Sequence, residues 1–272
     1  MRFAICNEIY QGWKLEDTLA HVRRTGYDAI EIAPFTLCSH VTDLDAAARA
    51  GIRGATDRAG LGISAIHWVL VGTEGMHLTH PDERVRWRTA DYFCSLVDFC
   101  ADLGSDRIVV GSPKQRSLLP GVSPEQAWAW AREVFGPSVR RAERRGVVLC
   151  FEPLAPVETD FVTTAAEGVR FARSFGSEAM RIILDVKAMS SEPTPVPDII
   201  RATGAADFAY FHANDKNLKG PGFGEVDFVP IAQALRDTGY DGTVSVEVFK
   251  FEEGPEAIAE GSLRTLRAAF AR

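Results

Sequence analysis

The sequence predicts an α/β barrel in which eight parallel strands alternate with eight helices. Three observations predict this fold: short apolar runs alternate eight times with amphipathic stretches, the chain has 272 residues, and no linker or composition shift divides it. Near-continuous apolar strands separated by helices are typical of a parallel sheet that helices cover. Eight such units in about 250 residues are the size of a closed (β/α)8 barrel. We therefore expect residues 1–272 to form a single (β/α)8 barrel domain.

The strand candidates are short runs rich in β-branched, aromatic and other apolar residues. They are residues 3–6, 29–33, 63–67, 107–111, 147–152, 181–185, 207–212 and 243–247. Each run is followed by residues with helical spacing, as in the first helix, where Leu15, Leu19 and Val22 share one face. The helix candidates are residues 15–26, 43–59, 82–103, 123–145, 163–175, 196–203, 228–238 and 255–270. Several of these stretches end in a glycine that suits a helix C-cap: Gly60, Gly104, Gly146 and Gly239.

An open doubly wound sheet is the alternative to the barrel. That fold is expected to carry a glycine-rich phosphate loop after an early strand, and neither GxGxxG nor GxxxxGK[ST] occurs there. The longest irregular pieces, residues 68–82 and 112–122, both follow strands. Barrels carry their functional loops at these positions, so the sequence favours the barrel.

The composition is that of an ordinary soluble globular protein, with 46% hydrophobic and 25% charged residues. The net charge of -7 disfavours a nucleic-acid partner. Five cysteines without a CxxC pair indicate reduced, mostly buried thiols in a cytosolic protein. No run approaches 18 apolar residues and the N-terminus lacks a signal-like segment, so we expect a cytoplasmic protein that does not contact membranes.

Four consecutive strand candidates end in residues that bind metals: Glu152, Asp185, His212 and Glu247. Each follows an apolar run, and in a barrel such strand ends converge on one mouth. Alone, each has a structural alternative, such as a helix N-cap or a salt-bridge partner. Together, three carboxylates and one imidazole suit Mn²⁺, Mg²⁺, Co²⁺ or Zn²⁺, and without a cation the carboxylates would repel one another. The sequence therefore predicts a metal site.

Charged residues near the other strand ends have two interpretations each. In the segment GSPKQR, residues 111–116, Lys114 and Arg116 suit recognition of an anion or a polyhydroxylated group, and the alternative is a solvated loop. Glu8 and Glu31 lie near the ends of the first two strands and would contact sugar hydroxyls or form ion pairs. We predict substrate contacts for Lys114 and Arg116.

Further substrate contacts are predicted at the same mouth. His67 would hydrogen-bond a hydroxyl, and Trp68 would stack on a sugar ring or belong to the core. Glu158 and Lys187 follow the fifth and sixth strands and are expected to face the mouth. Asp215 completes the set because it lies three residues after His212 in a segment crowded with polar groups.

The chain resembles the sugar phosphate isomerase/epimerase superfamily of xylose isomerase-like TIM barrels. The segments that carry the resemblance are FEPL (151–154), LDVKAM (184–189), FHANDKN…GPGFGEVDF (211–228) and VSVEVF (244–249). The four strand-end ligands are separated by 33, 27 and 35 residues, which fits the family pattern. The resemblance implies one divalent ion, with Mn²⁺ favoured, held by Glu152, Asp185, His212 and Glu247. It also implies that Glu152 and Glu247 act as the acid/base pair.

The function that this resemblance implies is the isomerisation or epimerisation of a sugar or sugar derivative. Proton transfer would pass through a metal-stabilised enediolate. The alternative is a metal-dependent dehydratase or lyase acting on a keto-inositol or a 3-oxo-sugar glycoside, since both reactions begin with the same enolate. A sugar-binding protein with a vestigial site is disfavoured because none of the four ligands is replaced.

Three positions depart from the ketose 3-epimerases of this superfamily. Ala188 stands where they carry a histidine, Leu218 where they carry an arginine, and Ala155 where they usually carry an asparagine. Two substrate-oxygen contacts of those enzymes are therefore missing, which disfavours the 3-epimerisation of free ketohexoses. The expected partner is a small carbohydrate, and homo-oligomer formation through Trp13, Trp87, Trp128 or Trp130 is left open.

Overall fold

Eight parallel strands form a closed barrel in the computed structural model, which describes residues 1–271. The strands are β1 (Arg2–Cys6), β2 (Ala29–Ile32), β3 (Gly62–Ile66), β4 (Arg107–Val110), β5 (Val148–Phe151), β6 (Met180–Asp185), β7 (Phe208–Ala213) and β8 (Thr243–Val246). Each pairs with the next in chain order, and β1 pairs with β8 to close the ring. The predicted fold class is confirmed.

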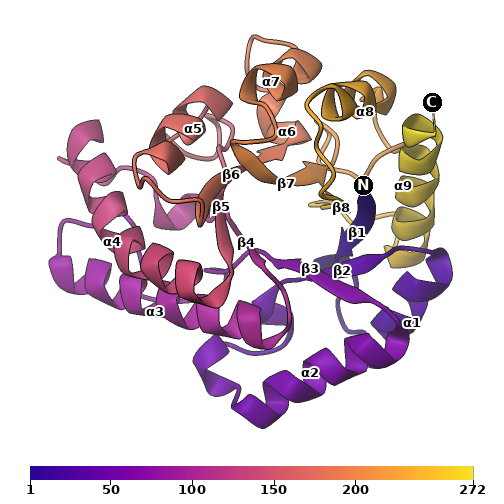
Figure 1. Ribbon diagram of the computed structural model, residues 1–272, viewed down its shortest axis with the longest axis horizontal. Coiled ribbons are helices and arrows are strands. Elements are labelled where there is room, and N and C mark those ends of the chain that lie inside the picture. Colours follow the sequence, from indigo (N-terminus) through magenta and orange to yellow (C-terminus); the bar gives the residue numbers. More distant parts are fainter. Residues whose placement is uncertain (272) are drawn as a thin grey trace.

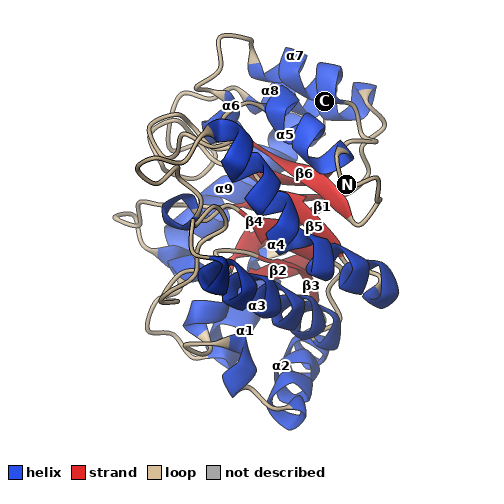
Figure 2. Cartoon of the chain, turned by 90° about the vertical axis from the view of Figure 1, so that its left-hand side faces the viewer, coloured by secondary structure: helices blue, strands red, loops and turns tan. Residues whose placement is uncertain are grey.

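Helices surround the strands as an outer ring (Figure 1). They are α1 (Leu15–Thr25), α2 (Ala46–Ala59), α3 (Glu83–Asp102), α4 (Pro124–Arg145), α5 (Ala165–Arg173), α6 (Val186–Met189), α7 (Val196–Thr203), α8 (Phe228–Asp237) and α9 (Pro255–Phe270). The last helix, α9, packs between α8 and α1 and so completes the ring. Long loops gather on the side of the barrel opposite the N-terminus, which is the side where the strands end (Figure 2).

Two details of the predicted elements needed correction. Strands β2, β3, β4, β5 and β8 end one residue earlier than expected and β7 ends one residue later. Glu152 and Glu247 therefore begin the loops that follow β5 and β8. The short helix α6 was not predicted, because four residues are too few to show a periodic pattern. It forms because Asp185 caps it, its Oδ1 accepting the backbone N–H of Ala188 at 2.7 Å.

Apolar side chains fill the space on both sides of the sheet. Between strands and helices, Phe151 packs against Phe135 and Phe171, with ring centroids 5.9 and 4.7 Å away. A smaller cluster joins residues of consecutive strands: Ala65, Val109, Cys150, Ile183 and Tyr210. Alternate residues of a strand point the same way, so Tyr210 and His212 share the face of β7. This alternation places His212 next to a packed, dry layer.

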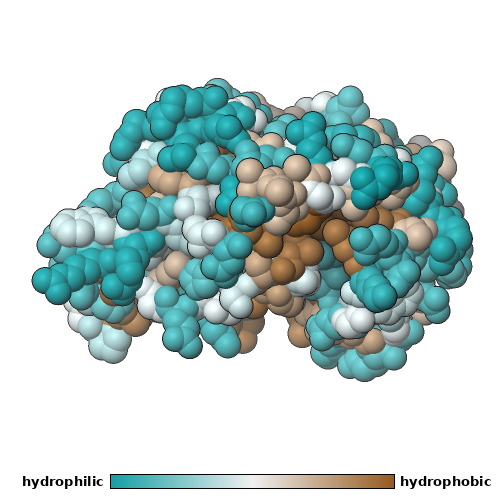
Figure 3. All heavy atoms as spheres, turned by 90° about the horizontal axis from the view of Figure 1, so that it is seen from below, coloured by the Kyte–Doolittle hydropathy of each residue, from teal (hydrophilic) through white to brown (hydrophobic). Residues whose placement is uncertain are grey.

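The outer surface is mostly hydrophilic. Viewed over α2, teal side chains dominate and hydrophobic residues gather around a central hollow (Figure 3). Within the described residues the large apolar side chains that are exposed are Trp13, Val71, Trp87 and Val157. No helix among residues 1–271 is long and apolar enough to cross a bilayer. The five cysteines are unpaired, three of them buried, as the sequence predicted.

Candidate metal centre

The four predicted ligands converge at the carboxyl ends of β5 to β8. Asp185 ends β6, His212 lies one residue before the end of β7, and Glu152 and Glu247 directly follow β5 and β8. All four are buried, and each offers one ligand atom that lies within 4.8 Å of the others. The strand register brings them together, since Asp185 is the cross-strand partner of His212. This cluster is the candidate metal centre.

Glu247 accepts hydrogen bonds from two N–H groups and lies beside two imidazole rings. Its Oε1 accepts a hydrogen bond from the indole of Trp68 at 2.8 Å, and His67 Nδ1 lies 3.6 Å from the same oxygen. Its Oε2 lies 3.1 Å from His212 Nδ1 and 3.4 Å from the side-chain amide of Asn214. Burial raises the pKa of Glu247, but His212 and His67 outweigh burial and hold that pKa well below its ordinary value. Glu247 is therefore a fixed carboxylate.

The carboxyl group of Glu152, unlike that of Glu247, receives no hydrogen bond from a side chain among the described residues, and a Cβ atom on the neighbouring Gly111 would collide with it. Burial raises the pKa of Glu152 to about 8, helped by the negative charges of Glu247 and Asp185. Burial and the two carboxylates thus outweigh the positive charges of His212 and Lys187 at this carboxyl group.

These residues fit a divalent cation. Three carboxylates and one imidazole provide mixed oxygen and nitrogen ligands, and burial together with the repulsion between the carboxylates raises the pKa of Glu152. Asn214 supports the set: its amide nitrogen donates to Asp185 Oδ2 at 2.5 Å, and its oxygen accepts the backbone N–H of Lys187 at 2.8 Å. Asn214 was not predicted, although its position two residues after His212 on an alternating strand was a usable signal.

A cavity of about 430 Å³ opens onto the two glutamates. Its apolar wall includes Trp68, Leu154 and Phe249. Trp68 stacks between Phe35 and Phe249, with ring centroids 5.7 and 5.9 Å away. The backbone of Trp68 has φ of +51°, which is uncommon outside glycine and indicates a functional constraint. This conformation accompanies the indole N–H contact with Glu247.

Lys187 and Glu158 form an ion pair on the cavity wall. Lys187 Nζ lies 2.8 Å from Glu158 Oε1 and 4.1 Å from the centre of the Phe249 ring. Burial lowers the pKa of Lys187, but Asp185 and Glu247 outweigh it and raise that pKa above its ordinary value. A charged ammonium group therefore faces the acidic cluster.

Comparison with known proteins identifies the family. A family model described as xylose isomerase-like TIM barrel matches residues 19–269. The chain belongs to the xylose isomerase-like TIM barrel family.

Its curated relatives include epimerases. The chain is 29% identical to a D-psicose 3-epimerase of Ruminiclostridium cellulolyticum over 236 residues, which cover 84% of this chain and 76% of the relative. It is 26% identical to an L-ribulose 3-epimerase of Mesorhizobium japonicum, with 88% of this chain and 77% of the relative covered. Relatives named as sugar epimerases support an isomerase or epimerase enzyme.

Solved structures share the fold of this xylose isomerase-like barrel. A D-psicose 3-epimerase crystallised in the presence of D-fructose superposes with a TM-score of 0.83 at 24% identity, covering 100% of this chain and 97% of that one. A 3-keto-D-glucoside 4-epimerase from E. coli superposes with a TM-score of 0.85 at 20% identity, covering 98% and 99%.

The predicted substrate residues divide into two groups. Trp68, Lys114, Glu158 and Lys187 line the cavity. His67, Arg116 and Asp215 do not line it, and all three are buried. Position after a strand therefore does not decide whether a side chain points into the cavity.

Each residue of the second group has protein partners. Arg116 donates to the backbone oxygens of Glu152 at 2.6 Å and Val162 at 3.3 Å, and its guanidinium lies 4.8 Å from the centre of the Phe151 ring. It therefore fixes the backbone at Glu152, and the structure does not support the predicted substrate contact. The carboxylate of Asp215 accepts the backbone N–H of Val226 at 2.8 Å, so it stabilises its own loop.

His67 lies behind Glu247 rather than in the cavity. Its Nε2 lies 3.2 Å from Glu8 Oε2, its Nδ1 faces Glu247 Oε1, and the ring is fully buried. Burial lowers the pKa of His67, but Glu31 and Glu8 outweigh burial and raise that pKa to about 10. Of the two interpretations of Glu8, the ion pair is therefore the one observed.

Proposed function

We propose that this member of the xylose isomerase-like family is a divalent-metal-dependent epimerase or isomerase of a sugar or sugar derivative. One observation carries the proposal: two buried glutamates with opposite surroundings, Glu152 and Glu247, face one cavity beside Asp185 and His212. Proton transfer at a carbon next to a carbonyl needs two such groups, and pairs of carboxyls with divergent pKa values mark acid/base sites.

In this proposal Glu152, Asp185, His212 and Glu247 hold one ion, with Mn²⁺ as the first choice and Mg²⁺, Co²⁺ or Zn²⁺ as alternatives. The ion, when bound, would supply the positive charge that stabilises negative charge developing on the substrate oxygens. The chemistry of the four side chains supports this assignment, since a cation relieves the repulsion that raises the pKa of Glu152.

The two glutamates divide the proton transfer. Glu152 is the stronger base of the two because its carboxylate receives no side-chain hydrogen bond among the described residues, whereas the N–H groups around Glu247 weaken its basicity. Glu152 is therefore assigned the first proton removal, and Glu247 the second transfer. His67 and Trp68 keep the Glu247 carboxylate in place during that step.

The cavity wall supplies the substrate contacts. Lys187 and Lys114 donate to substrate oxygens, Glu158 accepts from a hydroxyl while it holds Lys187, and Trp68 covers the apolar face of the sugar. Ala188 replaces the histidine expected in ketose 3-epimerases, and its side chain cannot hydrogen-bond. The proposed substrates therefore include, beside free ketoses, sugar derivatives that carry an additional polar or charged group.

A substrate panel in D₂O tests the proposed function. The Mn²⁺-loaded protein is incubated with ketoses and oxo-sugars, and products are followed by NMR and mass spectrometry. We expect an epimer or isomer that gains one deuterium at the reacting carbon. Loss of water would instead indicate elimination, which the epimerase names of the relatives do not favour. The absence of any binding or activating divalent ion would overturn the proposal.

We also propose a carbohydrate as the only small-molecule partner and leave a homo-oligomer as a prediction. Of the four tryptophans predicted at an interface, Trp13 and Trp87 are exposed. Trp128 packs edge-on against Phe171 at 5.0 Å and therefore belongs to the core. Size-exclusion chromatography of Trp87→Arg beside the unchanged protein tests whether the exposed Trp87 lies at an interface between copies of the chain.

A further inference from the structure

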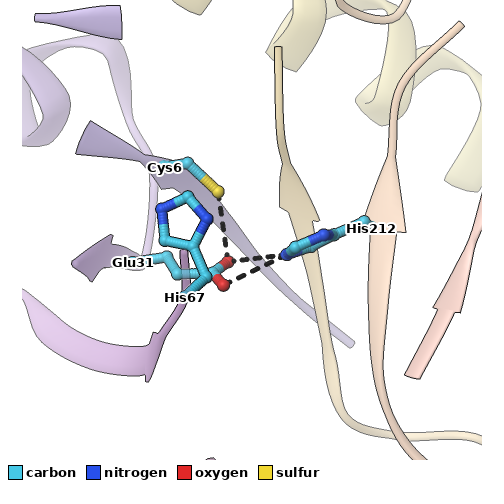
Figure 4. Close-up of side chains that lie close together, drawn as sticks. All are labelled: Cys6, Glu31, His67 and His212. Carbon is cyan, nitrogen blue, oxygen red and sulfur yellow. Dashed lines mark hydrogen bonds and ion pairs between the residues drawn. The ribbon is translucent and has the colours of Figure 1, made fainter. Parts of the chain in front are cut away.

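Glu31 lies at the centre of a buried polar cluster with Cys6, His67 and His212 (Figure 4), and none of these four residues lines the cavity. Its side chain is fully buried. The two carboxylate oxygens lie 3.1 and 3.2 Å from His212 Nε2. The Cys6 thiol donates to Glu31 Oε2 at 3.3 Å, and the Tyr210 hydroxyl donates to the same oxygen at 3.0 Å. The carboxylate is thus surrounded by donors and acts as an acceptor.

The two nitrogens of His212 face different groups. Nε2 faces Glu31, whereas Nδ1 lies 3.1 Å from Glu247 Oε2 and 4.0 Å from Asp185 Oδ2. A neutral imidazole carries one proton, and the hydrogen bond made by one nitrogen decides whether the other has a free lone pair. An acceptor at Nε2 therefore leaves Nδ1 free.

We propose that Glu31 is a positioning residue that holds the proton of His212 on Nε2 and so makes Nδ1 the nitrogen that binds the metal ion. The inference rests on the metal site of the proposed function. Glu31 would act only through His212, because it does not line the cavity and has no contact with substrate. Its position on β2, across the barrel from β7, fixes the plane of the imidazole as well as its tautomer.

A second cation site is the competing interpretation of this cluster. Cys6, Glu31, His67 and His212 each offer a donor atom, and these atoms lie within 4.8 Å of one another. Three of these residues are already joined by hydrogen bonds, however, because Cys6 and His212 contact Glu31. His67 Nε2 lies 3.2 Å from the carboxylate of Glu8, in an ion pair. A cation would have to replace these contacts. The hydrogen-bonded arrangement is therefore favoured, and the second site becomes an outcome of the test.

Co²⁺ binding to the wild-type protein provides the first test. Calorimetry should give one Co²⁺ per chain. NMR of the Co²⁺-loaded protein should show a strongly shifted imidazole N–H proton, assigned to His212 Nε2, that exchanges slowly with water because Glu31 shields it. Binding of one Co²⁺ without this protected proton overturns the role of Glu31 and leaves the metal site. Failure to bind Co²⁺ removes the metal site and, with it, the role of Glu31.

The variant Glu31→Gln provides the second test. Loss of a carboxylate that supports a ligating histidine commonly weakens metal binding by about 10- to 100-fold, and we expect that loss for Co²⁺ here. The matched control is Cys6→Ala, which removes another contact of the same carboxylate and leaves His212 in place; its Co²⁺ affinity should stay within about threefold. Circular dichroism checks both variants for folding. Should Glu31→Gln not fold, the N–H measurement on the wild-type protein decides.

Two results would favour the second cation site and overturn the proposal. One is a stoichiometry of two Co²⁺ per chain. The other is a thiolate-to-Co²⁺ charge-transfer absorption that disappears in Cys6→Ala. An unchanged Co²⁺ affinity in folded Glu31→Gln would also overturn it, because the histidine would then need no partner at Nε2.

Discussion

The two sides of the barrel contribute different kinds of polar residue to the candidate metal centre. Strands β5 to β8 and the residues that follow them provide the four candidate ligands, of which Glu152 and Glu247 face the cavity. Strands β1 to β3 and the residues that follow them provide Glu8, Glu31 and His67, which are fully buried. Glu31 contacts His212, His67 lies beside Glu247, and Glu8 contacts His67. Similar residue types at strand ends therefore do different work. The residues of β5 to β8 are arranged to contact a bound ion or substrate. The residues of β1 to β3 are arranged to keep those side chains in position.

The same contrast separates the two glutamates. Glu247 lies beside β1 and next to His67, and the indole N–H of Trp68 donates to its carboxylate. Glu152 lies on the other side of the cluster, and only its backbone is fixed, by Arg116. Two carboxyl groups of the same kind thus acquire different properties from their neighbours.

The largest effect is expected on turnover. The turnover of Glu152→Gln and of Glu247→Gln, each saturated with metal, should fall by about two or more orders of magnitude, because an amide cannot transfer the proton. At least one variant should retain exchange of a substrate proton with D₂O. The surface variant Glu225→Gln serves as the control. Full turnover in both metal-saturated variants would leave these residues as ligands only.

The next largest effect is the pH dependence of metal binding. The pKa of Glu152 is about 8 and that of His212 is raised well above its ordinary value, so both groups are protonated in the metal-free protein at pH 6. Each must lose its proton to bind a cation, so affinity should rise at least about tenfold per pH unit between pH 6 and 8. Calorimetry in buffers of different ionisation enthalpy measures the released protons. A flat profile would contradict the raised pKa values.

Removal of a single ligand should weaken metal binding by at least about tenfold, as expected for Asp185→Asn and His212→Ala. The fold should survive in Asp185→Asn, because asparagine also caps a helix such as α6. Equilibrium dialysis measures the affinity, with the exposed Asp106→Asn as the control. Unchanged affinity in both ligand variants would exclude this coordination set.

The smallest effect is expected from Trp68→Phe. The variant keeps the stacking with Phe35 and Phe249 but loses the N–H that donates to Glu247. A single hydrogen bond contributes about 1 kcal/mol, which corresponds to roughly fivefold in turnover, with little change in metal affinity. Steady-state kinetics with saturating metal provides the measurement. Identical kinetics would mean that the indole does not hold Glu247.

Most of the secondary structure could be predicted because it depends on local patterns. Apolar runs and helical spacing located all eight strands, and Gly60 and Gly146 end their helices in the left-handed conformation that the glycines suggested. The helix α6 was not predicted because its formation depends on one side-chain cap rather than on a periodic pattern. That residues 1–272 form one domain stays a prediction.

The sequence by itself determined the barrel and the residues at its mouth, since strand order and strand ends follow from position along the chain. It did not determine which way each side chain points. Arg116 and Lys114 lie two residues apart in one loop, yet Lys114 lines the cavity while Arg116 is buried against backbone oxygens. Likewise Glu31 meets His212 across 181 positions of sequence. Only the tertiary structure decides such pairings, because a buried charge takes its partner from whichever strand the closed barrel places opposite it.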